Sequence, residues 1–167
     1  AENSEISADG EGFDTFKKAL SLVTGTLCRC IAKDGEGATK LIECNVSGAK
    51  SEKDAKLIAK SVIKSPLVKT AMFGSDANWG RVLCAIGYSG AETNVSKIDV
   101  AFASKKGMVF VCKGGAGIDF SEDNAKKVLS DDEIKIIVGL GDGKSSATAF
   151  GCDLTYDYVK INGDYRT

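Results

Sequence analysis

The chain has 167 residues, of which 43% are hydrophobic and 27% are charged, and its formal net charge is −1 at pH 7. This length is typical of a single domain, and the composition is that of an ordinary globular protein. Lysine and arginine are spread along the chain, so no basic patch indicates binding to nucleic acid or to an anionic membrane surface. No apolar run has the roughly 18 residues that a membrane span needs.

The cysteines and the absence of histidine narrow the chemistry further. Cys28 and Cys30 have no second pair at the spacing of zinc ligands, and the chain contains no histidine. A zinc site or a histidine-based catalytic triad is therefore not expected. Most cysteines lie within apolar runs, where a free thiol behaves as a small hydrophobe. We expect reduced core residues of a cytoplasmic protein at Cys28, Cys30, Cys44, Cys84, Cys112 and Cys152.

The N-terminal region divides into a polar segment and a helix. Residues 1–12 are rich in glycine and acidic residues, and the first residue is Ala1 rather than Met, so we expect either processing or recombinant truncation to have set this end. From Phe13 onward, apolar residues recur every three or four positions, which predicts a helix with one stripe facing a core. We assign residues 13–167 to a single α/β domain. The stripe consists of Phe13, Phe16, Leu20, Val23, Leu27 and Ile31.

Glu36 is the first candidate for a functional side chain. It lies between Gly35 and Gly37, and glycines permit close backbone approach and unusual dihedral angles. A carboxylate in such a turn either is solvated or faces a cationic ligand, and the local sequence leaves both readings open. The strand predicted next, at residues 38–46, alternates so that Lys40 shares one face with Ile42, Cys44 and Val46.

A second helix is predicted between Ser51 and Pro66. Ser51 and Asp54 form a near capping box at its start, and Pro66, the only proline, ends it. Its apolar face comprises Ala55, Ile58, Ala59, Val62 and Ile63.

The stretch at residues 73–89 changes its period in the middle. Residues 67–73 have the length and composition of a short strand, and a turn follows in which Ser75 or Asp76 is the expected helix cap. Polar residues at a junction between strand and helix often carry chemistry in α/β proteins. The alternative to a functional site is that these residues only cap and start a buried helix. The turn carries Asp76, Asn78 and Arg81, and the helical face carries Trp79, Val82, Leu83 and Ile86.

Two β-hairpins and a short helix are predicted in the second half. The hairpins pair residues 98–104 with 108–113, and residues 133–140 with 146–154, while Ser121 caps the helix between them. A further short helical turn is expected after Thr155. Three longer helices, a short one and about six strands predict an α/β (mixed α+β) domain, with helices layered on a mixed or antiparallel sheet.

Three motifs together resemble one family over essentially the whole chain. They are DGEGATK at Asp34–Lys40, FGSDANWGR at Phe73–Arg81, and CDLTYDYVKINGDYRT at Cys152–Thr167. In this order and spacing they resemble the C-terminal β-chain portion of the ornithine acetyltransferases, also called glutamate N-acetyltransferases or the ArgJ family. Gly163 is a mild departure, because family members often have alanine there.

The resemblance implies an activity and a DmpA/ArgJ-like fold. Family members cleave themselves before a threonine, which becomes the N-terminal nucleophile of the β chain. This threonine takes the acetyl group from N2-acetyl-L-ornithine and passes it to L-glutamate, and some members also use acetyl-CoA. A threonine hydroxyl needs a base, for which the resemblance implies its own α-amine, and donors that stabilise the tetrahedral intermediate. No metal or organic cofactor is implied.

The same resemblance implies site residues in this chain. Glu36 matches a carboxylate that contacts the substrate amino acid, where it can pair with an ammonium group. Asn162 and Thr167 match C-terminal residues that also contact substrate. Asp76, Asn78 and Arg81 receive no role beyond holding the turn and the helix start, with Arg81 in an ion pair.

The nucleophile itself is not found in the chain. No threonine lies at its N-terminus, and Thr70, within KTAMF, leads directly into the DANWGR motif. We therefore expect a chain without a catalytic residue, inactive alone. The implied partners are an α chain and the remaining N-terminal part of the β chain, in a heterotetramer of two α and two β chains. The alternatives are a self-processing amidase or aminopeptidase on a similar fold, and a non-catalytic amino-acid-binding domain.

Overall fold

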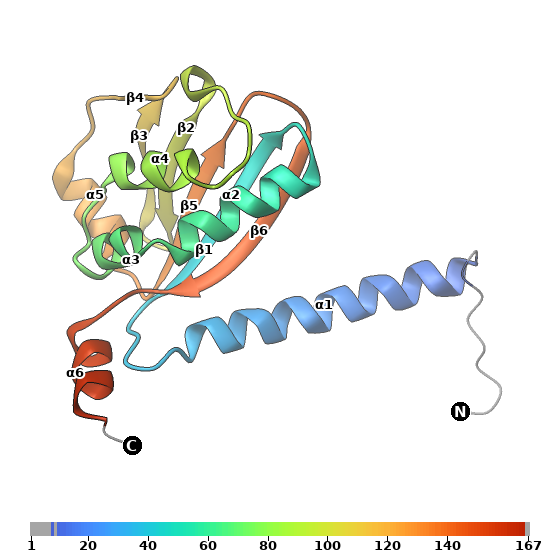
Figure 1. Ribbon diagram of the computed structural model, residues 1–167, viewed down its shortest axis with the longest axis horizontal. Helices are drawn as coiled ribbons and strands as arrows, with labels where there is room; N and C mark the ends of the chain where they lie inside the picture. The colour runs from blue at the N-terminus through green and yellow to red at the C-terminus, as the bar shows by residue number, and fades with distance from the viewer. Residues whose placement is uncertain (1–7, 9, 166–167) are drawn as a thin grey trace.

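The computed structural model describes residue 8 and residues 10–165. Within this part of the chain, helices pack on a six-stranded sheet of order β4-β3-β2-β5-β1-β6 (Figure 1). The strands are β1 (Leu41–Ala49), β2 (Asp99–Ser104), β3 (Gly107–Lys113), β4 (Ala116–Gly117), β5 (Glu133–Gly139) and β6 (Ser145–Cys152). The helices are α1 (Glu11–Lys33), α2 (Glu52–Lys64), α3 (Pro66–Phe73), α4 (Trp79–Gly87), α5 (Glu122–Leu129) and α6 (Tyr156–Asp164), with a short 3₁₀ turn at Val95–Lys97.

The sheet is mixed, as its sequence pattern predicted. β1 pairs in parallel with β5, and the other pairs are antiparallel. The predicted fold class is therefore confirmed. The hairpin of β2 and β3 is confirmed as well, but the second predicted hairpin is wrong. β1 lies between β5 and β6, so these two strands do not pair with each other although they are consecutive in sequence.

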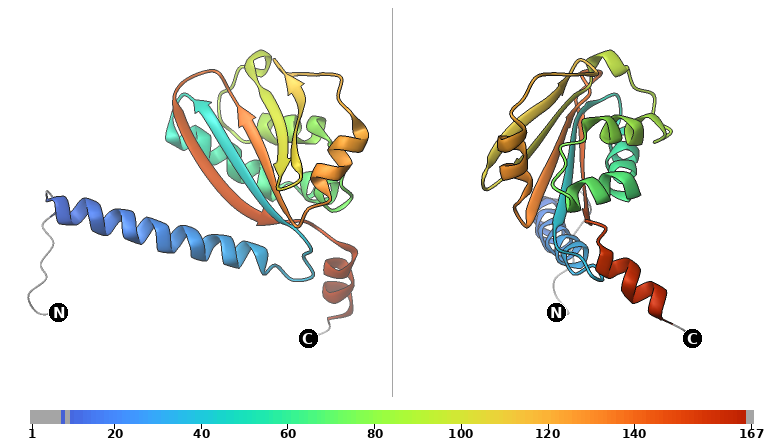
Figure 2. Two further views of the ribbon diagram at one scale, coloured as in Figure 1. Left: turned by 180° about the vertical axis from the view of Figure 1, so that it is seen from behind. Right: turned by 90° about the vertical axis from the view of Figure 1, so that its left-hand side faces the viewer.

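The core lies between one face of the sheet and the helices α2, α3 and α4 (Figure 2). The alternation predicted for the first strand is confirmed, because Ile42, Cys44 and Val46 are all buried on this face. Every residue of the predicted apolar face of α2 is also buried. Ser51 caps this helix by accepting a hydrogen bond from the Asp54 amide at 3.0 Å.

Residues 67–73, predicted as a strand, belong instead to the helix α3. Pro66 lies in its first turn, where a missing amide hydrogen costs nothing, and Ser65 accepts a hydrogen bond from the Val68 amide. Pro66 therefore ends α2 and also starts α3. A short apolar segment does not distinguish a buried strand from a buried helix by its period.

Helix α1 extends away from the sheet, and only its C-terminal part lies near β1 and β6 (Figure 1). None of its described residues is buried. The predicted stripe exists, but the expectation that it faces a core is wrong within the described residues. Phe16 is 49% exposed and Ile31 is 74% exposed. The stripe has no apolar partner in this part of the chain.

The cysteines divide into two groups. Cys44 and Cys112 are buried, and burial raises the pKa of the Cys44 thiol to about 12. The prediction of core residues is wrong for Cys28, Cys30 and Cys84, which are exposed, and Cys152 is only partly buried. Local apolar sequence around a cysteine does not show which side of a helix it occupies.

We expect Ile58→Ala to lower the free energy of unfolding by about 2–5 kcal/mol, because it leaves a cavity where the side chain is fully buried between α2 and the sheet. Urea denaturation of this chain measures the change. Leu67→Ala is the control, since that side chain is 56% exposed, and we expect a change of about 0.5 kcal/mol or less. Equal losses for both variants would contradict this assignment of the core.

Candidate functional site

The loop that carries Glu36 packs against the first turn of α6. Gly37 has φ of +65°, and a Cβ built on it would lie 2.7 Å from the Tyr158 amide nitrogen. Both the left-handed backbone and the close approach of α6 require glycine here. The glycine before Glu36 is also constrained, because a Cβ on Gly35 would meet the Cys152 sulfur at 2.5 Å.

Glu36 and Asn162 lie in direct contact. The Asn162 Nδ2 donates a hydrogen bond to Glu36 Oε2 at 2.6 Å and a second one to the Tyr158 carbonyl at 2.9 Å. Both side chains are exposed, so they are accessible to a ligand from solvent. The structure thus brings together two of the three predicted site residues, which are 126 positions apart. The third, Thr167, lies outside the described residues.

Helix α6 is attached to the rest of the fold near its start. Thr155 caps it by accepting a hydrogen bond from the Tyr158 amide at 3.2 Å. The Tyr156 ring meets Phe73 of α3 edge-on, with ring centroids 5.5 Å apart. Lys69, also on α3, donates a hydrogen bond to the Cys152 carbonyl.

Lys40 connects the loop of Glu36 to two helix ends. Its ammonium donates to the Met72 carbonyl at 2.7 Å, to the Leu129 carbonyl at 2.8 Å and to the Ser75 hydroxyl at 2.8 Å. Met72 and Leu129 lie at the C-terminal ends of α3 and α5, where the helix dipole favours a cation. Burial lowers the pKa of Lys40, and the nearby Asp153 carboxylate opposes that shift.

Sequence reasoning assigned no role to Lys40, although a signal was present. The predicted alternation placed this lysine on the same face as Ile42 and Cys44, which are buried. A charged side chain in the inward register of a strand needs acceptors at that place. The carbonyl oxygens of two helix ends supply them.

The motif residues Asp76, Asn78 and Arg81 hold the turn before α4. Asn78, rather than the predicted Ser75 or Asp76, caps the helix by accepting from the Arg81 amide at 3.1 Å, and its Nδ2 donates to Asp76 Oδ2 at 3.0 Å. The Arg81 side chain donates to the Leu67 carbonyl at 2.9 Å. The expected ion pair of Arg81 is therefore replaced, in the described residues, by hydrogen bonds to α3.

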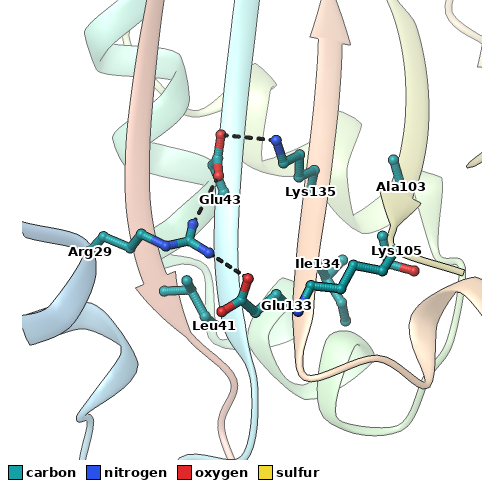
Figure 3. Close-up of a pocket in the computed structure, with 9 residues that line it drawn as sticks. Arg29, Leu41, Glu43, Ala103, Lys105, Glu133, Ile134 and Lys135 are labelled. Carbon is teal, nitrogen blue, oxygen red and sulfur yellow. Dashed lines mark hydrogen bonds and ion pairs between the residues drawn. The ribbon is translucent and has the colours of Figure 1, made fainter. Parts of the chain in front are cut away.

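A cavity of about 570 Å³ lies elsewhere, against the sheet face that α2 does not cover (Figure 3). Arg29 of α1 bridges two carboxylates there, Glu43 Oε2 at 3.3 Å and Glu133 Oε2 at 2.5 Å. Lys33 pairs with Glu133 at 2.9 Å, and Lys135 lies 3.8 Å from Glu43. Three basic side chains share these two carboxylates, and the network attaches the C-terminal end of α1 to β1 and β5.

A larger groove, of about 1300 Å³, lies between α1 and α2. Gly35, which precedes Glu36, and Cys152, which precedes the segment leading into α6, are among its lining residues. Glu36 and Asn162 themselves are not among the residues that line this groove. We take this contact, rather than the charged cavity of Figure 3, as the candidate site.

Comparison with known proteins gives a family match. The ArgJ family model matches residues 1–167. The chain belongs to the ArgJ family. It is 58% identical over 167 residues to the arginine biosynthesis bifunctional protein ArgJ of Caldanaerobacter subterraneus, covering 100% of this chain and 41% of that protein. It is 56% identical over 165 residues to arginine biosynthesis bifunctional protein ArgJ 1 of Clostridium acetobutylicum, covering 99% of this chain and 40% of that protein.

A solved structure agrees with this assignment. The crystal structure of arginine biosynthesis bifunctional protein ArgJ from Bacillus halodurans matches with a TM-score of 0.91 and 46% identity, over 98% of this chain and 76% of that chain. The predicted resemblance to the ArgJ family is thus confirmed. The chain spans about 40% of the length of the curated relatives it matches. Its placement as the C-terminal β-chain portion stays a prediction.

We expect the Glu133 network to support stability at neutral pH and to lose that support in acid. The hydrogen bond from Lys33, with the charge of Arg29, holds the pKa of Glu133 below its ordinary value of 4.5, against the opposing effect of desolvation. A carboxyl group whose pKa is depressed by folding stabilises the folded state above its unfolded pKa, and this contribution disappears as the pH falls through the folded pKa.

Urea denaturation across the acid range measures this effect. Glu133→Gln should reduce the loss of unfolding free energy below about pH 4.5, because the variant has no carboxylate to protonate. Glu92→Gln is the control, since that side chain is 92% exposed and, among residue 8 and residues 10–165, is paired only with Lys50. An unchanged acid dependence in Glu133→Gln would show that the network does not contribute.

Proposed function

We propose that this chain is part of an arginine-biosynthesis acetyltransferase. The enzyme moves the acetyl group of N2-acetyl-L-ornithine to L-glutamate through an acetyl-threonine intermediate, releasing L-ornithine and N-acetyl-L-glutamate. The nucleophilic threonine lies outside this chain. Membership of a family whose relatives are named arginine biosynthesis bifunctional proteins supports the pathway. The bifunctional name is consistent with acetyl-CoA as a second acetyl donor.

The contact between Glu36 and Asn162 is the observation that carries the proposal to this chain. Asn162 Nδ2 bonds to Glu36 Oε2, while Glu36 Oε1 has no partner among the described residues. A substrate ammonium group can therefore pair with Glu36 without breaking the existing bond. The Asn162 carbonyl oxygen and the terminal Thr167 are then the groups that orient the rest of the amino acid.

The chemistry proceeds by double displacement. The threonine oxygen attacks the acetyl carbonyl, the ornithine amine leaves, and an ester forms. The glutamate amine then attacks this ester and restores the threonine hydroxyl. Glu36 takes no part in bond making. The α-nitrogen of N2-acetyl-L-ornithine carries the acetyl group, so the ammonium that pairs with Glu36 is the one on the side chain. The role of Glu36 is to hold this donor so that its acetyl carbonyl faces the threonine, which lowers the entropic part of the barrier.

Two observations support partner chains. The exposed stripe of α1 is a helix face without an apolar partner in the described residues, and such a face is typical of a contact surface. The matched crystal chain is also much shorter than the curated relatives, since this chain covers 76% of the former and about 40% of the latter. We therefore propose partners in the form of an α chain and the remainder of the β chain, in a heterotetramer of two of each.

We also propose a cytoplasmic location, in keeping with a biosynthetic role. Among the described residues, none of the helices has the length and apolar character needed to cross a membrane.

The direct test uses the complete polypeptide that contains this chain. We expect acetyl transfer from N-acetylornithine to glutamate, and mass spectrometry should show a chain that starts with threonine and includes this sequence. Acetyl release to water alone, unaffected by glutamate, would indicate an amidase instead. Absence of both cleavage and transfer would contradict the proposal and favour a ligand-binding domain.

We expect Glu36→Ala in the complete enzyme to lower kcat/KM more than about tenfold, because it leaves the bound ammonium group without its carboxylate. The thermal midpoint should stay near that of the wild type, since Glu36 is exposed. Glu92→Ala, another exposed acid, is the matched control for kinetics. Wild-type kinetics of Glu36→Ala would remove this residue from the site.

A further inference from the structure

The segment between β6 and α6 holds the loop of Glu36 through a buried carboxylate. Asp153 is only 3% exposed. Its Oδ1 accepts hydrogen bonds from the Thr39 amide at 2.9 Å and the Lys40 amide at 3.0 Å, and its Oδ2 accepts from the Thr39 hydroxyl at 2.5 Å. One side chain therefore fixes the end of the loop that carries Glu36.

Thr155 makes a second connection two residues later. It is 4% exposed, and its hydroxyl donates to the Gly37 carbonyl at 2.6 Å while accepting from the Tyr158 amide at 3.2 Å. The same oxygen atom thus bonds to the residue after Glu36 and to the first turn of the helix that carries Asn162. Asn162 lies about two helical turns beyond Thr155, on the same face of α6 as Tyr158.

The contact between Glu36 and Asn162 depends on these buried bonds. Two exposed side chains contribute little to holding their own geometry, because solvent competes for each of them. A carboxylate shared by three donors and a hydroxyl that bonds at both ends are far more restrictive. The close packing of Gly37 against Tyr158 leaves the loop no room to shift toward α6.

We infer that Asp153 and Thr155 are positioning residues that set the distance between Glu36 and Asn162 at the substrate site. This inference rests on the proposed function, because it assumes that the Glu36–Asn162 pair binds the substrate amino acid. Neither residue needs to touch substrate. Each acts through the backbone that follows Glu36, at Gly37, Thr39 and Lys40, and Thr155 acts also through the start of α6.

Paired substitutions in the complete enzyme test the inference. Asp153→Ala removes the acceptor of three hydrogen bonds, whereas Asp153→Asn keeps an oxygen for the two amides and gives Thr39 a donor. Thr155→Val removes both bonds of the hydroxyl, whereas Thr155→Ser keeps them. We expect Asp153→Ala and Thr155→Val to lower kcat/KM about tenfold or more, mainly through a higher KM. Asp153→Asn and Thr155→Ser should remain within about threefold of the wild-type kcat/KM.

A double-variant experiment separates positioning from general stability. Combined with Glu36→Ala, Asp153→Ala should lower kcat/KM by less than about threefold further, because the group that it positions is already gone. A matched control is Asp142→Ala. Asp142 also accepts a hydrogen bond from a backbone amide, that of Asn94 at 3.0 Å. It lies, however, in the loop between β5 and β6, at the other end of β6 (Figure 1). We expect this control to lower stability while leaving KM unchanged.

Hydrogen exchange gives a readout that does not depend on activity. The Thr39 and Lys40 amides should exchange faster in Asp153→Ala and at the wild-type rate in Asp153→Asn. Two outcomes would overturn this inference while leaving the proposed site intact. In one, Asp153→Ala lowers kcat/KM as much in the Glu36→Ala background as in the wild type. In the other, Glu36→Ala is impaired but Asp153→Ala has a near-normal KM. Wild-type kinetics of Glu36→Ala would instead overturn the proposed site, and the inference with it.

Discussion

The start of β1 is held by a buried carboxylate and a partly buried ammonium group, and the rest of the site depends on this arrangement. Asp153 accepts the amides of Thr39 and Lys40, while the Lys40 ammonium reaches the C-terminal ends of α3 and α5. The first interaction joins the sheet to the segment that leads into α6. The second joins it to the helices of the core side. Each charge is satisfied by its own hydrogen bonds, and removing either side chain would leave its backbone partners without them.

This arrangement explains why the family motifs are far apart in sequence and adjacent in the fold. The DGEGATK motif contains Glu36 and Lys40, the FGSDANWGR motif contains Ser75, and the C-terminal motif contains Asp153 and Asn162. Lys40 bonds to Ser75, and Asn162 bonds to Glu36. Each motif therefore supplies one part of a single junction at the start of β1. The stripe of α1 is exposed in the described residues, and the chain spans about 40% of the length of the curated relatives it matches.

Much of the fold was predictable because it follows from local periodicity and capping. The apolar face of α2, the alternation along β1 and the caps at Ser51 and Ser121 are all properties of neighbouring residues. The resemblance of the motifs identified the family and two residues of the candidate site that the structure describes. Predictions failed where the local pattern was compatible with two structures. Residues 66–73 have no period that excludes a helix, and Pro66 is as suitable for a helix start as for a helix end.

The sequence by itself determined the amphipathic elements, the fold class and the motif residues, since each depends on side chains a few positions apart. The tertiary structure alone decided that β1 lies between β5 and β6, that the α1 stripe has no partner in the described residues, and that Glu36 meets Asn162. The physical reason is that strand order and contacts over 126 positions follow from which arrangement buries the most apolar surface and satisfies its polar groups. A local sequence pattern does not contain the information needed to predict these long-range contacts.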